Sequence, residues 1–160
     1  MVKKQNLLII TPQNLNKDNS AGDYRVYCLL KYLHKYFNIY LMVINDKIQP
    51  KDKTLNKYIK TYINKTNSTT TFKRYLKQYK IDYCLFERYF NLPFNLYKFI
   101  PLTKSIIDVH EIGFVKTQEL SKIKEISDYA KKIFKAKELL FYQNAKLLIC
   151  ISQKEKTFVI

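Results

Sequence analysis

The chain has 160 residues, with 29 Lys or Arg against 13 Asp or Glu, so its formal net charge is +16 at pH 7. This length fits one compact domain, 1–160, and leaves no room for a second domain of ordinary size. Hydrophobic residues make up 47% and aromatic residues 15%, which excludes a disordered chain despite the high charge. The scarcity of glycine and proline disfavours collagen-like, low-complexity and turn-rich all-β structures.

The excess charge comes almost entirely from lysine, and arginine occurs only at positions 25, 74 and 88. Lysine, asparagine, isoleucine and tyrosine are all abundant and all have A/T-rich codons, so genome composition can supply this charge without selection for a polyanion. Arginine is the residue suited to bidentate contacts with phosphates and bases. We therefore expect no nucleic acid partner, and we favour a solvated lysine surface or attraction to an anionic membrane leaflet.

The three cysteines, Cys28, Cys84 and Cys150, are too few and too scattered for a closed disulfide framework. They include no CxxC pair and the chain has two histidines, so we expect no metal and no bound cofactor. The N-terminal apolar run is too short for a signal peptide, and no window approaches the roughly 20 apolar residues of a membrane span. We expect a cytoplasmic protein, with peripheral contact on the inner face of the plasma membrane as an open alternative.

A continuous apolar run at 6–11 is typical of a strand buried on both faces, as in a parallel sheet. After a polar loop, apolar residues from position 23 to 37 have the spacing of one helical face. A second apolar run at 39–44 follows almost at once. These segments predict a strand–helix–strand unit with parallel strands.

The same alternation continues along the chain. It predicts, in order, a short helix around 58–63, a helix at 72–79, a strand at 81–86, a short helix or turn at 91–100, a strand at 105–109, a helical stripe at 117–144 and a strand at 147–151. The fold class is therefore α/β, with a Rossmann-like parallel sheet of about five or more strands flanked by helices.

Ligands of such sheets bind beyond the carboxyl ends of the strands, here 12–22, 87–89, 110–113 and 152–155. The first strand–helix turn contains neither GxGxxG nor GxxxxGK[ST], which excludes those two phosphate-binding loops. Gly22 could let a ligand approach the start of the helix. Alternatively, Ser20 or Asp23 caps the helix while Gly22 turns the chain.

Polar residues end two later strands. Asp108 and Glu111 flank His110, and such carboxylates can orient a histidine for acid–base work or for binding sugar hydroxyls. A structural histidine that caps the strand is the alternative. Glu87 and Arg88 could present polar groups to a ligand, or form an ion pair within the structure.

Four segments carry a family resemblance in the right order: Ser-Ala-Gly-Asp-Tyr-Arg at 20–25, Ile-Asp-Tyr-Cys-Leu-Phe-Glu-Arg at 81–88, Ile-Ile-Asp-Val-His-Glu at 106–111, and the stretch 137–155 that contains Cys-Ile-Ser-Gln-Lys-Glu. Together they resemble the N-terminal domain of GT-B glycosyltransferases of the retaining family four. The resemblance covers nearly the whole chain. It implies the N-terminal half of a GT-B fold, with the C-terminal donor-binding domain missing and the chain a fragment or one half of a split enzyme.

The resemblance implies an acceptor-binding half, inactive alone, that moves sugar from a nucleotide-sugar co-substrate to a glycan or lipid-linked acceptor in surface polysaccharide or lipopolysaccharide synthesis. It implies catalytic roles for His110 and Asp108. It implies substrate-binding roles for Gly22, Arg25, Glu87, Arg88 and Glu111. The alternative function is a basic α/β module that binds nucleic acid or anionic membrane without catalysis.

Overall fold

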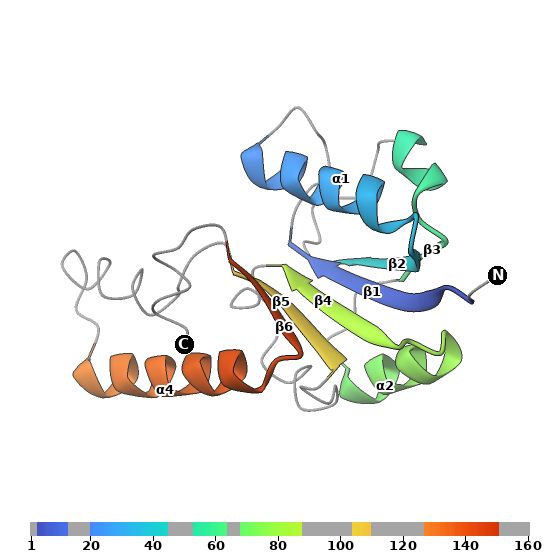
Figure 1. Ribbon diagram of the computed structural model, residues 1–160. Coiled ribbons are helices and arrows are strands. Elements are labelled where there is room, and N and C mark those ends of the chain that lie inside the picture. Colours follow the sequence, from blue (N-terminus) through green and yellow to red (C-terminus); the bar gives the residue numbers. More distant parts are fainter. Residues whose placement is uncertain are drawn as a thin grey trace.

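The computed structural model describes residues 3–12, 20–44, 53–63, 68–87, 104–109 and 127–150. Its centre is a sheet of six parallel strands in the order β3-β2-β1-β4-β5-β6 (Figure 1). The strands are β1 (Gln5–Thr11), β2 (Phe37–Val43), β3 (Thr61–Tyr62), β4 (Tyr83–Glu87), β5 (Ser105–Val109) and β6 (Leu147–Cys150). The helices are α1 (Ala21–Leu33), the 3₁₀ helix η1 (Lys53–Lys57), α2 (Thr69–Gln78) and α4 (Asp128–Asn144).

Strand β1 lies at the centre of the sheet because both of its faces are apolar. Its residues from Leu7 to Ile10 are fully buried. The strand pairs with β2 on one side and with β4 on the other, so its backbone hydrogen bonds are satisfied within the sheet. A continuous apolar run is what this position requires, because helices cover both faces of a parallel sheet.

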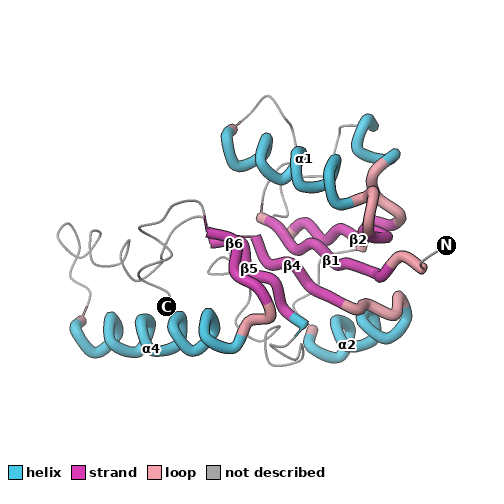
Figure 2. Tube along the Cα trace, in the orientation of Figure 1, coloured by secondary structure: helices cyan, strands magenta, loops and turns pink. Residues whose placement is uncertain are grey.

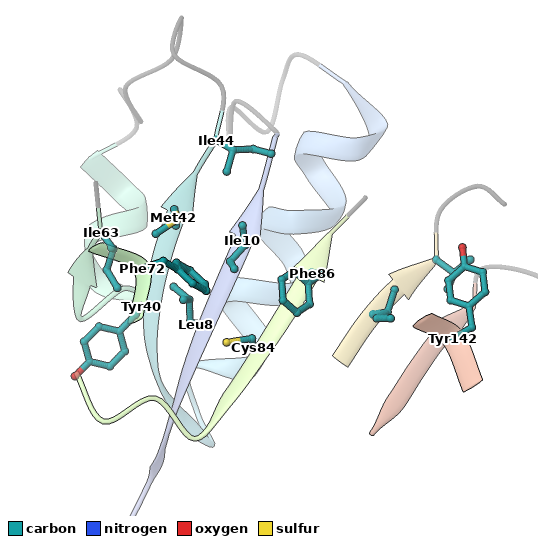
Figure 3. Close-up of a cluster of buried hydrophobic side chains, with 12 residues drawn as sticks. Leu8, Ile10, Tyr40, Met42, Ile44, Ile63, Phe72, Cys84, Phe86 and Tyr142 are labelled. Carbon is teal, nitrogen blue, oxygen red and sulfur yellow. The ribbon is translucent and has the colours of Figure 1, made fainter. Parts of the chain in front are cut away.

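The helices divide between the two faces of the sheet (Figures 1 and 2). On one face, Val26 and Leu30 of α1 and Leu55 of η1 pack against alternate residues of β1, β2 and β4. On the other face, Phe72 of α2 and Tyr142 of α4 belong to the second cluster of buried side chains (Figure 3). The fold therefore has three layers, with helices on both sides of one sheet.

The predicted α/β class is confirmed, and the observed strands lie close to the predicted ranges. The short helix predicted around 58–63 is wrong, because the structure has η1 followed by β3 in this region. Ile59 and Ile63 have helical spacing, but they pack in the clusters on opposite faces of the sheet. Backbone pairing with β2 determines this, since the amide of Ile63 donates to the carbonyl of Leu41 at 2.7 Å. The predicted segments at 91–100, 117–126 and 151–155 lie outside the described residues.

The buried Cys84 gives a test of the core. Burial raises the pKa of its thiol well above the ordinary value of 9.0. We expect iodoacetamide at about pH 8.5 to modify the exposed Cys28 rapidly and to leave Cys84 unmodified until the protein unfolds, as measured by mass spectrometry of peptides.

The same shift has a pH dependence with a definite sign. A raised pKa favours the folded state only while the thiol is protonated, so this contribution to stability is present below about pH 9 and is lost as the pH rises above it.

Modification of Cys84 by iodoacetamide at the rate of Cys28 in native buffer would contradict the packing described for β4.

Candidate functional site at the carboxyl edge of the sheet

The sheet has its topological switch point between β1 and β4. From β1 the chain builds outward to β2 and β3, and then returns to place β4, β5 and β6 on the other side of β1. This order, 3-2-1-4-5-6, is that of doubly wound Rossmann sheets. In sheets of this order, ligands bind beyond the carboxyl ends of the strands at the switch point, so this edge is the candidate site.

Three polar residues form one row across this edge. Thr11 ends β1 and Glu87 ends β4, and Glu87 stands in register with Asp108 of β5. The same row continues outward to Val43 on β2 and Ile149 on β6. The row is therefore polar at the switch point and apolar on both sides of it.

Thr11 and Glu87 are joined by a buried hydrogen bond. The Thr11 hydroxyl donates to Oε2 of Glu87 at 2.6 Å, and both residues have zero relative exposure. A short bond between a hydroxyl and a carboxylate is one of the stronger kinds of hydrogen bond. It fixes the Glu87 carboxylate at the point where β1 and β4 diverge.

Arg25 reaches from the second turn of α1 to Asp108. Its Nε donates to Oδ2 at 2.9 Å, and its Nη2 donates to Oδ1 at 2.5 Å. The Asp108 side chain is fully buried, whereas that of Arg25 is 29% exposed. This bidentate pair supplies the buried carboxylate with a cation and keeps the guanidinium at the border with solvent.

The start of α1 is held by a side-chain cap. Ser20 is in extended conformation, and its hydroxyl accepts from the amide of Asp23 at 3.1 Å. Gly22 is buried inside the first helical turn, and no described glycine has a positive φ. The predicted cap by Ser20 is confirmed, whereas Gly22, which the same prediction made the turning residue, lies within the helix.

The described residues of the edge include two carboxylates and one cation. Glu87 and Asp108 lie on adjacent strands, and two ionised carboxylates so placed repel each other. Arg25 offsets the charge of Asp108. A hydroxyl-rich ligand can donate to carboxylate oxygens, whereas a phosphate presents acceptors and negative charge that these oxygens repel.

The structure brings together most of the predicted site residues that it describes. Arg25 and Asp108 are in contact, Glu87 is the register neighbour of Asp108, and Gly22 lies in the first turn of the helix that carries Arg25. Three other predicted site residues lie outside the described part of the chain: Arg88, His110 and Glu111.

Sequence reasoning missed Thr11. The available signal was a hydroxyl residue at the end of a buried strand, on the same face as Leu7 and Ile9 and therefore directed toward α1.

Within the described residues, no three His, Cys, Asp or Glu side chains gather as metal ligands would. No helix in that same part of the chain has the length and apolar character needed to cross a membrane. Comparison with protein-family models, with curated proteins and with solved structures gave no match.

The Arg25–Asp108 pair can be tested by stability. Arg25→Met leaves a buried carboxylate without its cation, and we expect a loss of about 3 kcal/mol, the low end of the usual range because Arg25 is partly exposed. Urea denaturation measures this loss. The matched control is Lys31→Met on the same helix, which we expect to stay within about 0.5 kcal/mol of the unmodified chain.

Adding Asp108→Leu to Arg25→Met should restore part of the lost stability, since the charge left without its partner is then gone. If the double variant loses as much stability as Arg25→Met and Asp108→Leu lose separately in sum, the two side chains are not coupled.

Proposed function

We propose that this chain is the acceptor-binding half of a retaining glycosyltransferase. In this proposal it holds a glycan or lipid-linked acceptor at the carboxyl edge of the sheet, and a separate domain holds the nucleotide sugar. The proposal rests on the resemblance of segments 20–25, 81–88, 106–111 and 137–155 to GT-B enzymes, and on the two buried carboxylates at the carboxyl edge of the sheet.

The observation that carries the proposal is the buried pair of carboxylates at the switch point. Glu87 and Asp108 accept hydrogen bonds and disfavour phosphate, which suits a saccharide. A nucleotide-binding half would instead need a glycine-rich or basic phosphate cradle at this position, and the first strand–helix turn has neither motif. The edge therefore fits the acceptor side of a transferase better than the donor side.

In the proposed mechanism, the described residues position the acceptor. Arg25 presents a partly exposed cation at the border with solvent, and an acceptor hydroxyl that enters the edge reaches the buried Glu87, which Thr11 holds in place. Held in this way, the attacking hydroxyl needs little further ordering, which is a large part of catalysis between two bound reactants. The donor phosphates are stabilised by the second domain, so this half alone has negligible transferase activity.

We place the reaction in the cytoplasm, where nucleotide sugars are used, with contact to the inner face of the plasma membrane for a lipid-linked acceptor. This location is supported by the small number of cysteines, three that form no disulfide with one another, and by the excess of lysine.

Saccharide binding tests the proposal. Saturation-transfer NMR on the isolated chain, with a panel of mono- and disaccharides and with a nucleoside diphosphate, should detect saccharide and not the nucleotide. Glu87→Gln should weaken saccharide binding about tenfold, the value of one charge-assisted hydrogen bond. Asp82→Asn is the matched control, because its carboxylate bonds the amide of Asn6 at the opposite end of the sheet.

Nucleotide binding without saccharide binding would overturn the acceptor assignment. Equal effects of Glu87→Gln and Asp82→Asn would remove Glu87 from the site. Robust sugar transfer by the isolated chain would show that a second domain is not required.

A further inference from the structure

The outer face of α1 carries exposed aromatic and basic side chains in one stripe. Tyr24 is 56% exposed, Tyr32 59% and Tyr36, just after the helix, 55%. Lys31 and Lys35 are exposed between them. Within α1, Tyr24, Lys31 and Tyr32 lie away from the buried Val26 and Leu30, and Lys35 and Tyr36 follow directly after the helix. We call these five residues the Tyr–Lys face.

The tyrosines of this face are uncharged and preordered. The rings of Tyr32 and Tyr36 lie 5.4 Å apart at 52°, and Nζ of Lys35 is 6.0 Å from the Tyr32 ring. A side-chain hydrogen bond with Tyr36 raises the pKa of Tyr32 above its ordinary value of 10.0. Each residue thus presents an apolar ring with a neutral polar tip, the form that collects at the headgroup level of bilayers.

Among the described residues, the charge of this surface has one sign. The only acidic residue of α1, Asp23, is 2% exposed, whereas Lys31 in the last turn of α1 and Lys35, two residues after the helix, are exposed. Lys57 of η1 extends the positive region beside α1, with its Nζ 5.0 Å from the ring of Tyr58, and that ring in turn packs edge-on against Tyr27. The surface is complementary to an anionic layer.

The Tyr–Lys face suits a lipid bilayer better than a second copy of the chain or a nucleic acid. A second copy would bring like charges together. Single-stranded nucleic acid needs open ring faces for stacking, and here Tyr32 and Tyr36 pack on each other while Lys35 approaches Tyr32. Interfacial helices combine exposed aromatic rings with lysines that reach lipid phosphates.

We infer that the Tyr–Lys face docks the chain on an anionic lipid bilayer, with α1 lying along the membrane surface. This deepens the membrane contact proposed above and does not depend on glycosyl transfer. Because the face runs from Tyr24 near the start of α1 to Tyr36 just before the first residue of β2, docking lays the whole length of α1 on the headgroups.

Vesicle sedimentation tests the inference with the full chain. We expect binding to phosphatidylcholine vesicles that contain about 30% phosphatidylglycerol and little binding to phosphatidylcholine alone. Removing both charges in Lys31→Gln/Lys35→Gln should lower the partition constant at least tenfold, since each lysine contributes on the order of fivefold. The matched control is Lys73→Gln/Lys77→Gln on α2, on the opposite side of the sheet, which should change it less than threefold.

Cys28 gives a second measurement that reports orientation. Its thiol is exposed and lies one turn from Tyr24 and one turn from Tyr32. Anionic vesicles should slow its reaction with a charged maleimide at least about fivefold in the unmodified chain, and should leave the rate unchanged in Lys31→Gln/Lys35→Gln. Circular dichroism of this variant checks that it is folded.

Three results would overturn the inference: equal losses from both lysine pairs, an unprotected Cys28 on bound vesicles, or tight binding of a single-stranded oligonucleotide without vesicle binding. Saccharide binding by the isolated chain is a separate measurement, so failure of the membrane surface and failure of the acceptor site are distinguishable.

Discussion

The ion pair between Arg25 and Asp108 is the constraint on which the carboxyl edge depends. A fully buried carboxylate requires a compensating charge, and the cation comes from a helix 83 residues earlier in the chain. The pair ties the beginning of α1 to β5 across β1 and β4. It therefore sets where the capped helix start lies relative to the switch point of the sheet.

The polar row beside this pair departs from the pattern of the rest of the sheet. The row is polar at its centre, at Thr11, Glu87 and Asp108. The residues farther out in the same row, Val43 and Ile149, are apolar. Burying carboxylates costs free energy that apolar side chains would not cost. Departures of this kind concentrate at functional sites, and this one coincides with the point where the strand order reverses.

Charge is arranged differently in the interior and on the surface. The carboxylates of the edge are buried, whereas the lysines of α1 and α2 are exposed on opposite sides of the sheet. Among the described residues, the exposed lysines contribute to the net charge of +16, whereas the edge holds two buried carboxylates. A basic exterior with an acidic edge is compatible with a protein that approaches an anionic surface and binds a ligand rich in hydroxyl groups.

The sequence by itself determined five of the six strands of the sheet and the positions of α1, α2 and α4, because apolar runs and helical stripes are local patterns. The strand predicted at 105–109 is observed as β5 (Ser105–Val109). Only the tertiary structure decided the strand order, the two-residue β3, and the contacts of Arg25 with Asp108 and of Thr11 with Glu87. The two side-chain contacts join residues 76 and 83 positions apart, and strand register joins separate segments of the chain, so no local period carries this information.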